Sequence, residues 1–237
     1  MTPVLELEDL HAHYDKSHVL QGVSMTVGRG EIVSLLGRNG SGRSTTLKAI
    51  MGLVKPTGGR VQLEGQDVAG QRAYRIACAG IAYVPEEREI FANITVEENM
   101  RIGQQPPRNG APRWTIEQMY GFFPQLKVRR DTAAGMLSGG EQQMLTMCRA
   151  LLGNPKVILI DEPTEGLAPK IVEVVTDMVR EIRQQGVSVL LVEQKLTVAM
   201  RVSDRVYVMG HGHIVYEGTP EGLRQSPEVR SNWLEVN

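Results

Sequence analysis

The chain has 237 residues, and 41% of them are hydrophobic, so it can bury a sizeable core as one large domain or as a core with a smaller lobe. Its 26 basic and 27 acidic side chains give a formal net charge of -1. This balance supplies no electrostatic reason to expect binding to nucleic acid or direct binding to anionic lipid.

Two further features bear on where the chain works. The N-terminal segment MTPVLELEDL lacks the basic and apolar regions of a secretion signal, and no apolar run is as long as a membrane span. Cys78 and Cys148 lack the spacing of a zinc site or a redox pair, which fits a reducing compartment. Cys148 falls in an apolar helix stripe, where we expect a buried thiol. We expect any contact with a membrane to be made through another protein.

The first part of the chain predicts strands followed by a helix. Residues 4–10, 18–27 and 31–37 partly alternate apolar and polar side chains, with glycine at the breaks. The last of these, EIVSLLG, is nearly all apolar, as expected of a strand that is buried on both faces. After a glycine-rich loop, RSTTLKAIMGL places Leu47, Ile50 and Met51 at helical spacing and ends at Gly52.

The pattern changes to helices without intervening strands between residues 86 and 153. This part contains WTIEQMYGFF and GEQQMLTMCRALL, and residues 104–113 resemble a linker. Strands return with KVILID and VSVLLVE, which predicts α/β alternation with a parallel sheet. The helix between them starts at Pro169 and is expected to bury Ile171, Val175, Met178 and Ile182. The C-terminal SPEVRSNWLEV predicts a short amphipathic helix, with Val229, Trp233 and Leu234 on the side that packs against its own domain.

The segment GRNGSGRST has the glycines of a phosphate-binding loop. It satisfies G-x-x-x-x-G-[KR]-[ST] once arginine is admitted at position 43, and Gly40 leaves the backbone free to curl its N–H groups around phosphate. The preceding strand and following helix argue against a chance Gly/Ser turn, and Ser44 can offer its hydroxyl to Mg²⁺. The residues predicted to bind nucleotide here are Gly37, Arg38, Asn39, Gly40, Ser41, Gly42, Arg43, Ser44 and Thr45.

Two carboxylates, Asp161 and Glu162, follow the apolar strand KVILI. They should lie at the carboxyl edge of the sheet, where α/β proteins bind ligands. Asp161 can hold Mg²⁺ through water, and Glu162 can orient or deprotonate an attacking water. An ordinary acidic turn after a strand would not explain why it accompanies a phosphate loop.

The segment LSGGEQQ predicts an unusual helix start. Ser138 and Glu141 are spaced as a capping box before an apolar-striped helix. Gly139 and Gly140 inside this cap cost helix stability and allow close approach to the exposed N–H groups, which favours an anion as the ligand.

Together, GRNGSGRST, LSGGEQQ and VILIDEP resemble the ATP-binding subunit of an ABC transporter over essentially the whole chain. The resemblance implies an α/β fold of the P-loop NTPase (RecA-like) type. Its sheet core would be mostly parallel, with an N-terminal antiparallel β portion and an inserted α-helical subdomain. Residues 1–237 would form one ABC ATPase domain, with 1–85 and 154–237 as the catalytic core and 86–153 as the helical subdomain that carries the signature.

The resemblance also implies how ATP is bound. Two such domains pack head to tail, and each ATP lies between the phosphate loop of one and the signature of the other, so that Ser138, Gly139, Gly140 and Glu141 would act across the dimer. Tyr14 matches the aromatic residue that stacks on adenine, although it can also be a half-buried tyrosine on a strand. A short permease helix docks beside the helical lobe, and residues 86–100 are candidates for that contact.

Closer matches indicate a subgroup. YVPEEREIF, DEPTEGLAP, LLVEQ and GHIVYEGTPEGL resemble the second ATPase of branched-chain amino acid importers, a group that includes urea and amide importers. The resemblance implies ATP and Mg²⁺ as cofactors, a paralogous ATPase or a second copy as partner, two permeases, and a periplasmic binding protein that acts indirectly. The chain would lie on the cytoplasmic side of the inner membrane. An ABC protein of ribosomes or DNA is disfavoured, since those usually carry two such domains or long coiled coils.

Three positions depart from the general pattern of the family. Glu86 replaces a glutamine near Mg²⁺ and can still bind its shell, and Gln194 replaces a histidine and can hydrogen-bond a phosphate oxygen or water without titrating. Arg43 replaces the loop lysine and keeps its charge, but its guanidinium is wider and planar. With Glu162, Gln194 and Arg43 as catalytic residues, we expect an ATPase. The alternative is a nucleotide-binding module with little hydrolysis of its own, which closes a dimer with an active paralogue.

Overall fold

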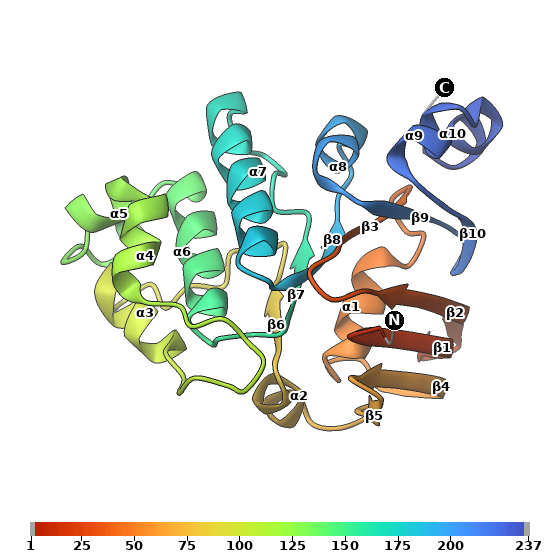
Figure 1. The fold of residues 1–237 in the computed structure, drawn as a ribbon, viewed down its shortest axis with the longest axis horizontal. Coiled ribbons are helices and arrows are strands. Elements are labelled where there is room, and N and C mark those ends of the chain that lie inside the picture. The colour runs from red at the N-terminus through yellow and green to blue at the C-terminus, as the bar shows by residue number, and fades with distance from the viewer. Residues whose placement is uncertain (1–2, 235–237) are drawn as a thin grey trace.

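The computed structural model describes residues 3–234, and its larger sheet has six strands (Figure 1). The strand order is β10-β9-β3-β8-β7-β6. All neighbours pair in parallel except β10, which runs antiparallel to β9. The strands are β3 (Ile32–Gly37), β6 (Ile81–Val84), β7 (Val157–Asp161), β8 (Ser188–Val192), β9 (Arg205–Gly210) and β10 (His213–Gly218). The predicted parallel α/β sheet is confirmed.

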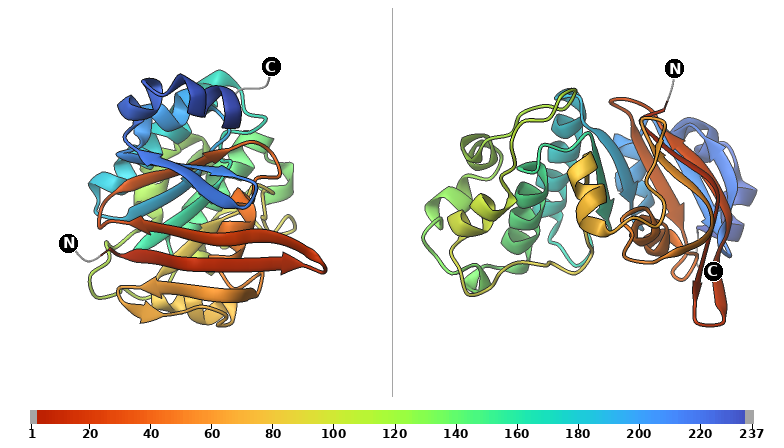
Figure 2. Two further views of the ribbon diagram at one scale, coloured as in Figure 1. Left: turned by 90° about the vertical axis from the view of Figure 1, so that its right-hand side faces the viewer. Right: turned by 90° about the horizontal axis from the view of Figure 1, so that it is seen from below.

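A second sheet is antiparallel and contains the predicted N-terminal strands. Its order is β2-β1-β4-β5, and Figure 2 shows it stacked beside the larger sheet. Its strands are β1 (Leu5–Tyr14), β2 (Ser17–Val27), β4 (Pro56–Leu63) and β5 (Gln66–Asp67). The first strand runs four residues past the predicted segment because Tyr14 still pairs with Ser17 at the hairpin turn.

Helices without strands between them fill the chain from β6 to β7 and gather at one end of the molecule (Figures 1 and 2). They are α3 (Val96–Gly103), α4 (Ile116–Phe122), α5 (Pro124–Val128), the 3-10 turn η1 (Ala134–Met136) and α6 (Gly139–Leu151). The first of them begins only at Val96, because the capping box of Thr95 and Glu98 sets its start and residues 86–95 form a loop.

The remaining helices flank the sheets. They are α1 (Arg43–Ile50), α2 (Ala73–Ala79), α7 (Pro169–Gln184), α8 (Leu196–Val202), α9 (Pro220–Arg224) and α10 (Pro227–Trp233). As predicted, α7 buries Val175, Met178 and Ile182, whereas Ile171 is only partly buried against the same cluster. Among the described residues, no helix combines the length and apolar character that crossing a membrane requires.

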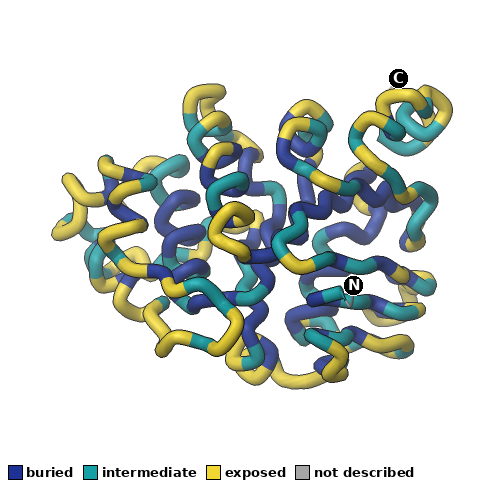
Figure 3. Tube along the Cα trace, in the orientation of Figure 1, coloured by how far each residue is buried: buried dark blue, intermediate teal, exposed yellow. Residues whose placement is uncertain are grey.

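The core has two main apolar layers, one on each face of the larger sheet. In β7, Ile158 and Ile160 face the layer shared with α6 and α7, whereas Val157 and Leu159 face the layer shared with the antiparallel sheet. Because successive side chains of a strand point to opposite faces, a strand covered on both sides needs an uninterrupted apolar run. Figure 3 shows these central strands as buried throughout. Cys148 is fully buried in the helix-side layer, as predicted, and burial raises the pKa of its thiol.

The C-terminal helix α10 packs on its own chain, as predicted. Val229, Trp233 and Leu234 lie against a small apolar cluster that includes Leu36 and Val208. The indole of Trp233 lies so close to Gly210 that a Cβ there would come within 2.3 Å of its ring. The last two residues of the predicted helix segment, 235 and 236, lie outside the described residues.

Replacing Gly210 by valine should displace this indole. We expect Gly210→Val to lower the free energy of unfolding by about 1–3 kcal/mol, the usual cost of overpacking, and to shift the fluorescence of Trp233 toward that of a solvated indole. The measurement is denaturant unfolding together with emission spectra. Gly121→Ala is the control, since nothing lies within 4 Å of its Cβ position. An unchanged spectrum and midpoint for Gly210→Val would contradict the packing described.

Candidate functional site

The strand order brings the phosphate loop and the carboxylates to one edge of the larger sheet. β8 pairs with β3 on one side and with β7 on the other, all in parallel, so the segments that follow β3 and β7 leave the sheet at the same edge. The loop continues into α1 at Gly42, whose φ of 109° lies in the left-handed region and which provides no capping side chain. The first N–H groups of α1 therefore have no side-chain cap, as an anion site requires.

A hollow of about 290 Å³ opens beside this loop. It joins three segments that are far apart in the sequence, namely the loop, the segment after β6 and the segment after β7. Its lining residues are Asn39, Gly40, Ser41, Gly42, Arg43, Ser44, Thr45, Glu86 and Glu162. Most of the residues predicted to bind phosphate, and two of the three predicted carboxylates, thus meet in one place.

The third carboxylate, Asp161, is almost fully buried behind Ser44. The Ser44 hydroxyl donates to one Asp161 oxygen at 3.0 Å, and the Tyr83 hydroxyl donates to the other at 3.2 Å. Burial raises the pKa of Asp161, while these two hydrogen bonds oppose that change. Tyr83 was not predicted as a site residue. Its only signal is its place in YVPEE, three residues before Glu86, near the end of a strand that the sequence pattern did not reveal.

Arg43 and Glu162 form a buried ion pair inside the hollow. Arg43 Nη2 lies 2.9 Å from Glu162 Oε1, and the two side chains are 4% and 10% exposed. Burial raises the pKa of Glu162, and the charge of Arg43 opposes this. Glu162 has a φ of 43°, which is uncommon for a bulky residue, and its N–H donates to Val192 O at 2.9 Å. The neighbouring strand therefore holds a strained backbone in place where the carboxylate leaves the sheet.

Two buried donors in the hollow have no partner among the described residues. They are Arg43 Nη1 and Ser41 Oγ. Buried polar atoms normally have a hydrogen-bond partner, so an orphaned pair of donors at a glycine-rich loop fits an anionic ligand with several acceptor oxygens. The polyphosphate of ATP has this chemistry.

The residues predicted to bind metal do not form a cage of their own. Within residues 3–234, no group of three or more His, Cys, Asp or Glu side chains is arranged to hold a metal ion. Mg²⁺ is usually bound through one or two carboxylates, with water and substrate phosphates completing its shell. Ser44, Asp161 and Glu86 fit that kind of shared shell.

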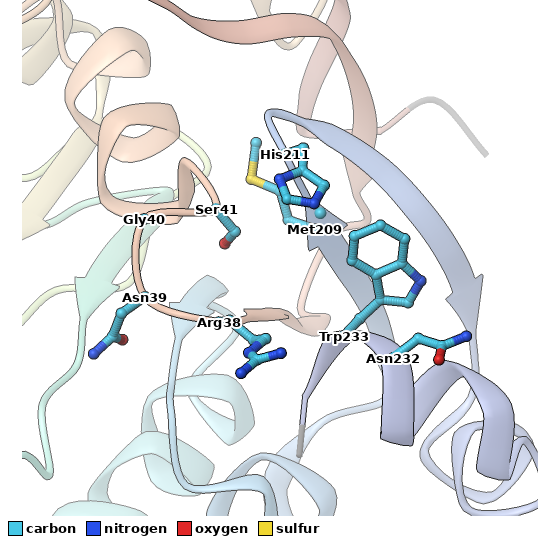
Figure 4. A pocket seen from close by; sticks show the side chains of 9 residues that line it. Arg38, Asn39, Gly40, Ser41, Met209, His211, Asn232 and Trp233 are labelled. Carbon is cyan, nitrogen blue, oxygen red and sulfur yellow. The ribbon is translucent and has the colours of Figure 1, made fainter. Parts of the chain in front are cut away.

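Two further hollows flank the same loop. One, of about 230 Å³, lies between Arg38 to Ser41 and the C-terminal part of the chain, where His211, Asn232 and Trp233 line it (Figure 4). The other, of about 340 Å³, contains Gln194 together with Gly37, Arg38 and Asn39. The structure thus brings Gln194 to the loop, but on a side different from Glu162.

Besides Asp161, two predicted groups line none of these three hollows. Tyr14 is 46% exposed at the end of β1. Ser138 to Glu141 lie at the start of α6, where the predicted capping box is present: the Ser138 hydroxyl accepts from Glu141 N, and the Glu141 carboxylate accepts from Ser138 N at 2.8 Å. The guanidinium of Arg88, which was not predicted as a site residue, occupies the space that a Cβ at position 139 would fill. A cation therefore lies beside this helix start.

Comparison with known proteins gives the family. A family model described as "ABC transporter" matches residues 20–165. The chain is similar to BraG of Pseudomonas aeruginosa, a high-affinity branched-chain amino acid transport ATP-binding protein, with 38% identity over 98% of this chain and 99% of that protein. It is also 33% identical to LptB of Haemophilus influenzae, a lipopolysaccharide export system ATP-binding protein, over 98% of this chain and 97% of the relative.

Solved structures agree with the fold. The ADP conformation of MJ1267, an ATP-binding cassette of an ABC transporter, matches with a TM-score of 0.83 and 28% identity over 98% of both chains. A nucleotide-free ATP-binding cassette gives the same TM-score and identity over 96% of this chain and 97% of that one. The predicted P-loop NTPase fold is thereby confirmed. The chain belongs to the ABC transporter family, as an ATP-binding subunit whose ATPase activity is coupled to transport.

Proposed function

We propose that this chain hydrolyses ATP to energise an importer for branched-chain amino acids or related small amino acids and amides. The observation that carries the proposal is the single hollow where the phosphate loop, Arg43 and Glu162 meet in front of the Ser44–Asp161 pair. The similarity to BraG over nearly the full length of both chains supports the substrate class. The identity to LptB is lower than the identity to BraG, so we favour import over lipopolysaccharide export.

Each residue of the hollow has a proposed role. The loop N–H groups and Arg43 bind phosphate, and Glu162 orients or deprotonates the attacking water. Ser44, Asp161 and Glu86 would hold Mg²⁺, which supplies charge neutralisation at the phosphates when bound. Gln194 can hydrogen-bond phosphate or water without changing its charge. Tyr83 fixes the Asp161 carboxylate through its hydroxyl.

The signature residues act on the partner subunit in this proposal. Ser138, Gly139, Gly140 and Glu141 line none of the three hollows around the loop of their own chain, and a head-to-tail dimer would bring a second loop to them. Tyr14, exposed at the hairpin, is available to stack on adenine. ABC ATPase subunits work as dimers with membrane permeases. We propose a paralogous ATPase or a second copy as the partner, on the cytoplasmic face of the inner membrane, with a periplasmic binding protein supplying substrate.

An apolar groove of about 520 Å³ is the proposed docking place for the permease. It lies between α2, α3 and α6, where the core meets the proposed helical subdomain of residues 86–153. Exposed Tyr74, Phe91 and Ile102 line it. The candidate segment 86–100 contributes only Phe91 to the groove, and Met100 belongs to the core instead. Exposed large apolar side chains around one groove are typical of a protein interface.

Hydrolysis should depend on Glu162. We expect Glu162→Gln to lower kcat by about 10²-fold or more, the usual contribution of a general base, while ATP still binds. Phosphate release by the assembled transporter and ATP titration measure the two effects separately. Glu117→Gln, at an exposed position on α4, is the control. Equal turnover of the wild type and Glu162→Gln would refute an ATPase site built on this carboxylate.

The proposed permease contact at this groove can be tested by placing one charged side chain in it. We expect Ile102→Asp to abolish co-purification with the permeases, because a buried carboxylate without a partner costs several kcal/mol at an interface. Val128→Asp introduces the same charge at an 88% exposed position on α5 and should leave the complex intact. Thermal unfolding checks that both variants fold. Normal complex formation by Ile102→Asp would place the permease elsewhere.

The transported substrate can be tested in cells. We expect disruption of the gene to abolish high-affinity uptake of labelled leucine or of a small amide, with recovery when the wild-type gene, but not Glu162→Gln, is returned. Surface lipopolysaccharide is measured in the same strains. Normal uptake combined with a loss of surface lipopolysaccharide would replace the importer by an export system.

A further inference from the structure

Arg43 contacts two different side chains through the same nitrogen. Its Nη2 donates to Asn39 Oδ1 at 3.1 Å and lies 2.9 Å from Glu162 Oε1. Asn39 belongs to the loop before α1, and Glu162 follows β7, so the guanidinium links two segments that are distant in sequence. At 4% exposure, the side chain has little freedom to move away.

The other terminal nitrogen of Arg43 is unused. Nη1 is buried and has no hydrogen-bond partner within residues 3–234. A guanidinium is planar and holds its nitrogens in a fixed fork, so a ligand oxygen at Nη1 would not have to displace Glu162 from Nη2. The remaining hollow of about 290 Å³, of which Arg43 is only one wall, leaves room for such a ligand.

We propose that Arg43 is the residue that positions Glu162, holding its carboxylate through Nη2 while Nη1 takes an oxygen of the bound polyphosphate. This inference rests on the proposed ATPase function. A lysine carries a single nitrogen and cannot hold two oxygens at a fixed spacing in this way. In this chain the arginine is therefore more than a tolerated replacement of the loop lysine: it connects the phosphate to the carboxylate that acts on water.

The test is a double-mutant cycle in the full-length chain with Arg43→Lys, Glu162→Asp and the double variant. Arg43→Lys keeps the charge, so we expect ATP affinity within about threefold of the wild type, but a kcat lower by about ten- to hundredfold, as for a misplaced catalytic group. Glu162→Asp should lower kcat by a similar factor. The double variant should be little slower than the slower single variant, since neither side chain then depends on the other.

The same double-mutant cycle is also measured on protein stability, in the absence of nucleotide. The unfolding midpoints of the same four proteins report the ion pair directly, and the two substitutions should again be less than additive. Arg60→Lys is the matched control, because it makes the same replacement in an exposed pair with Glu8 and should change neither kcat nor affinity.

Three outcomes overturn the positioning role. They are a kcat of Arg43→Lys equal to or above that of the wild type, losses in kcat that multiply in the double variant, and a loss of ATP affinity that accounts for the whole effect of Arg43→Lys. The proposed function fails separately, when wild-type turnover does not exceed that of Glu162→Gln.

Discussion

The parallel pairing of β8 with both β3 and β7 is the constraint on which the site depends. Parallel strands end at the same edge, so this one arrangement places a phosphate loop next to a pair of carboxylates that lie more than a hundred residues further along the chain. The two apolar layers stabilise the arrangement from both faces. The positive φ of Glu162 is tolerated there because its backbone N–H is tied to Val192 of the same sheet.

The site also has to solve an electrostatic conflict. Glu86, Asp161 and Glu162 are gathered where a polyanion must bind, and burial together with mutual repulsion raises the pKa values of Asp161 and Glu162. Hydrogen bonds from Ser44 and Tyr83 stabilise one carboxylate, and the charge of Arg43 stabilises the other. A buried ion pair contributes little net stability, since desolvation offsets the attraction. Its value here lies in the orientation of Glu162.

Two surfaces away from the hollow are the proposed contacts with partners. The capping box of Ser138 and Glu141 satisfies the start of α6 from within the same helix, and Arg88 lies beside it. No other segment of the chain is required to cap this helix. The apolar groove at α2, α3 and α6 has exposed large apolar side chains along its walls. We therefore propose both surfaces as contacts that the chain makes in an assembly.

Local patterns in the sequence were enough to predict the alternation of strands and helices, the loop, the capping box at Ser138 and the C-terminal helix, because each depends on residues close in sequence. They did not reveal β6 or Tyr83, since those depend on which strands become neighbours. The start of α3 at Val96 was also missed, although its capping box of Thr95 and Glu98 is local in sequence. The sequence by itself determined that residues 37–45 and the pair Asp161–Glu162 could serve a nucleotide. Only the tertiary structure decided that Arg43 lies against Glu162 with Nη1 unpartnered, because long-range strand pairing and burial, not spacing along the chain, set the distance between two charges.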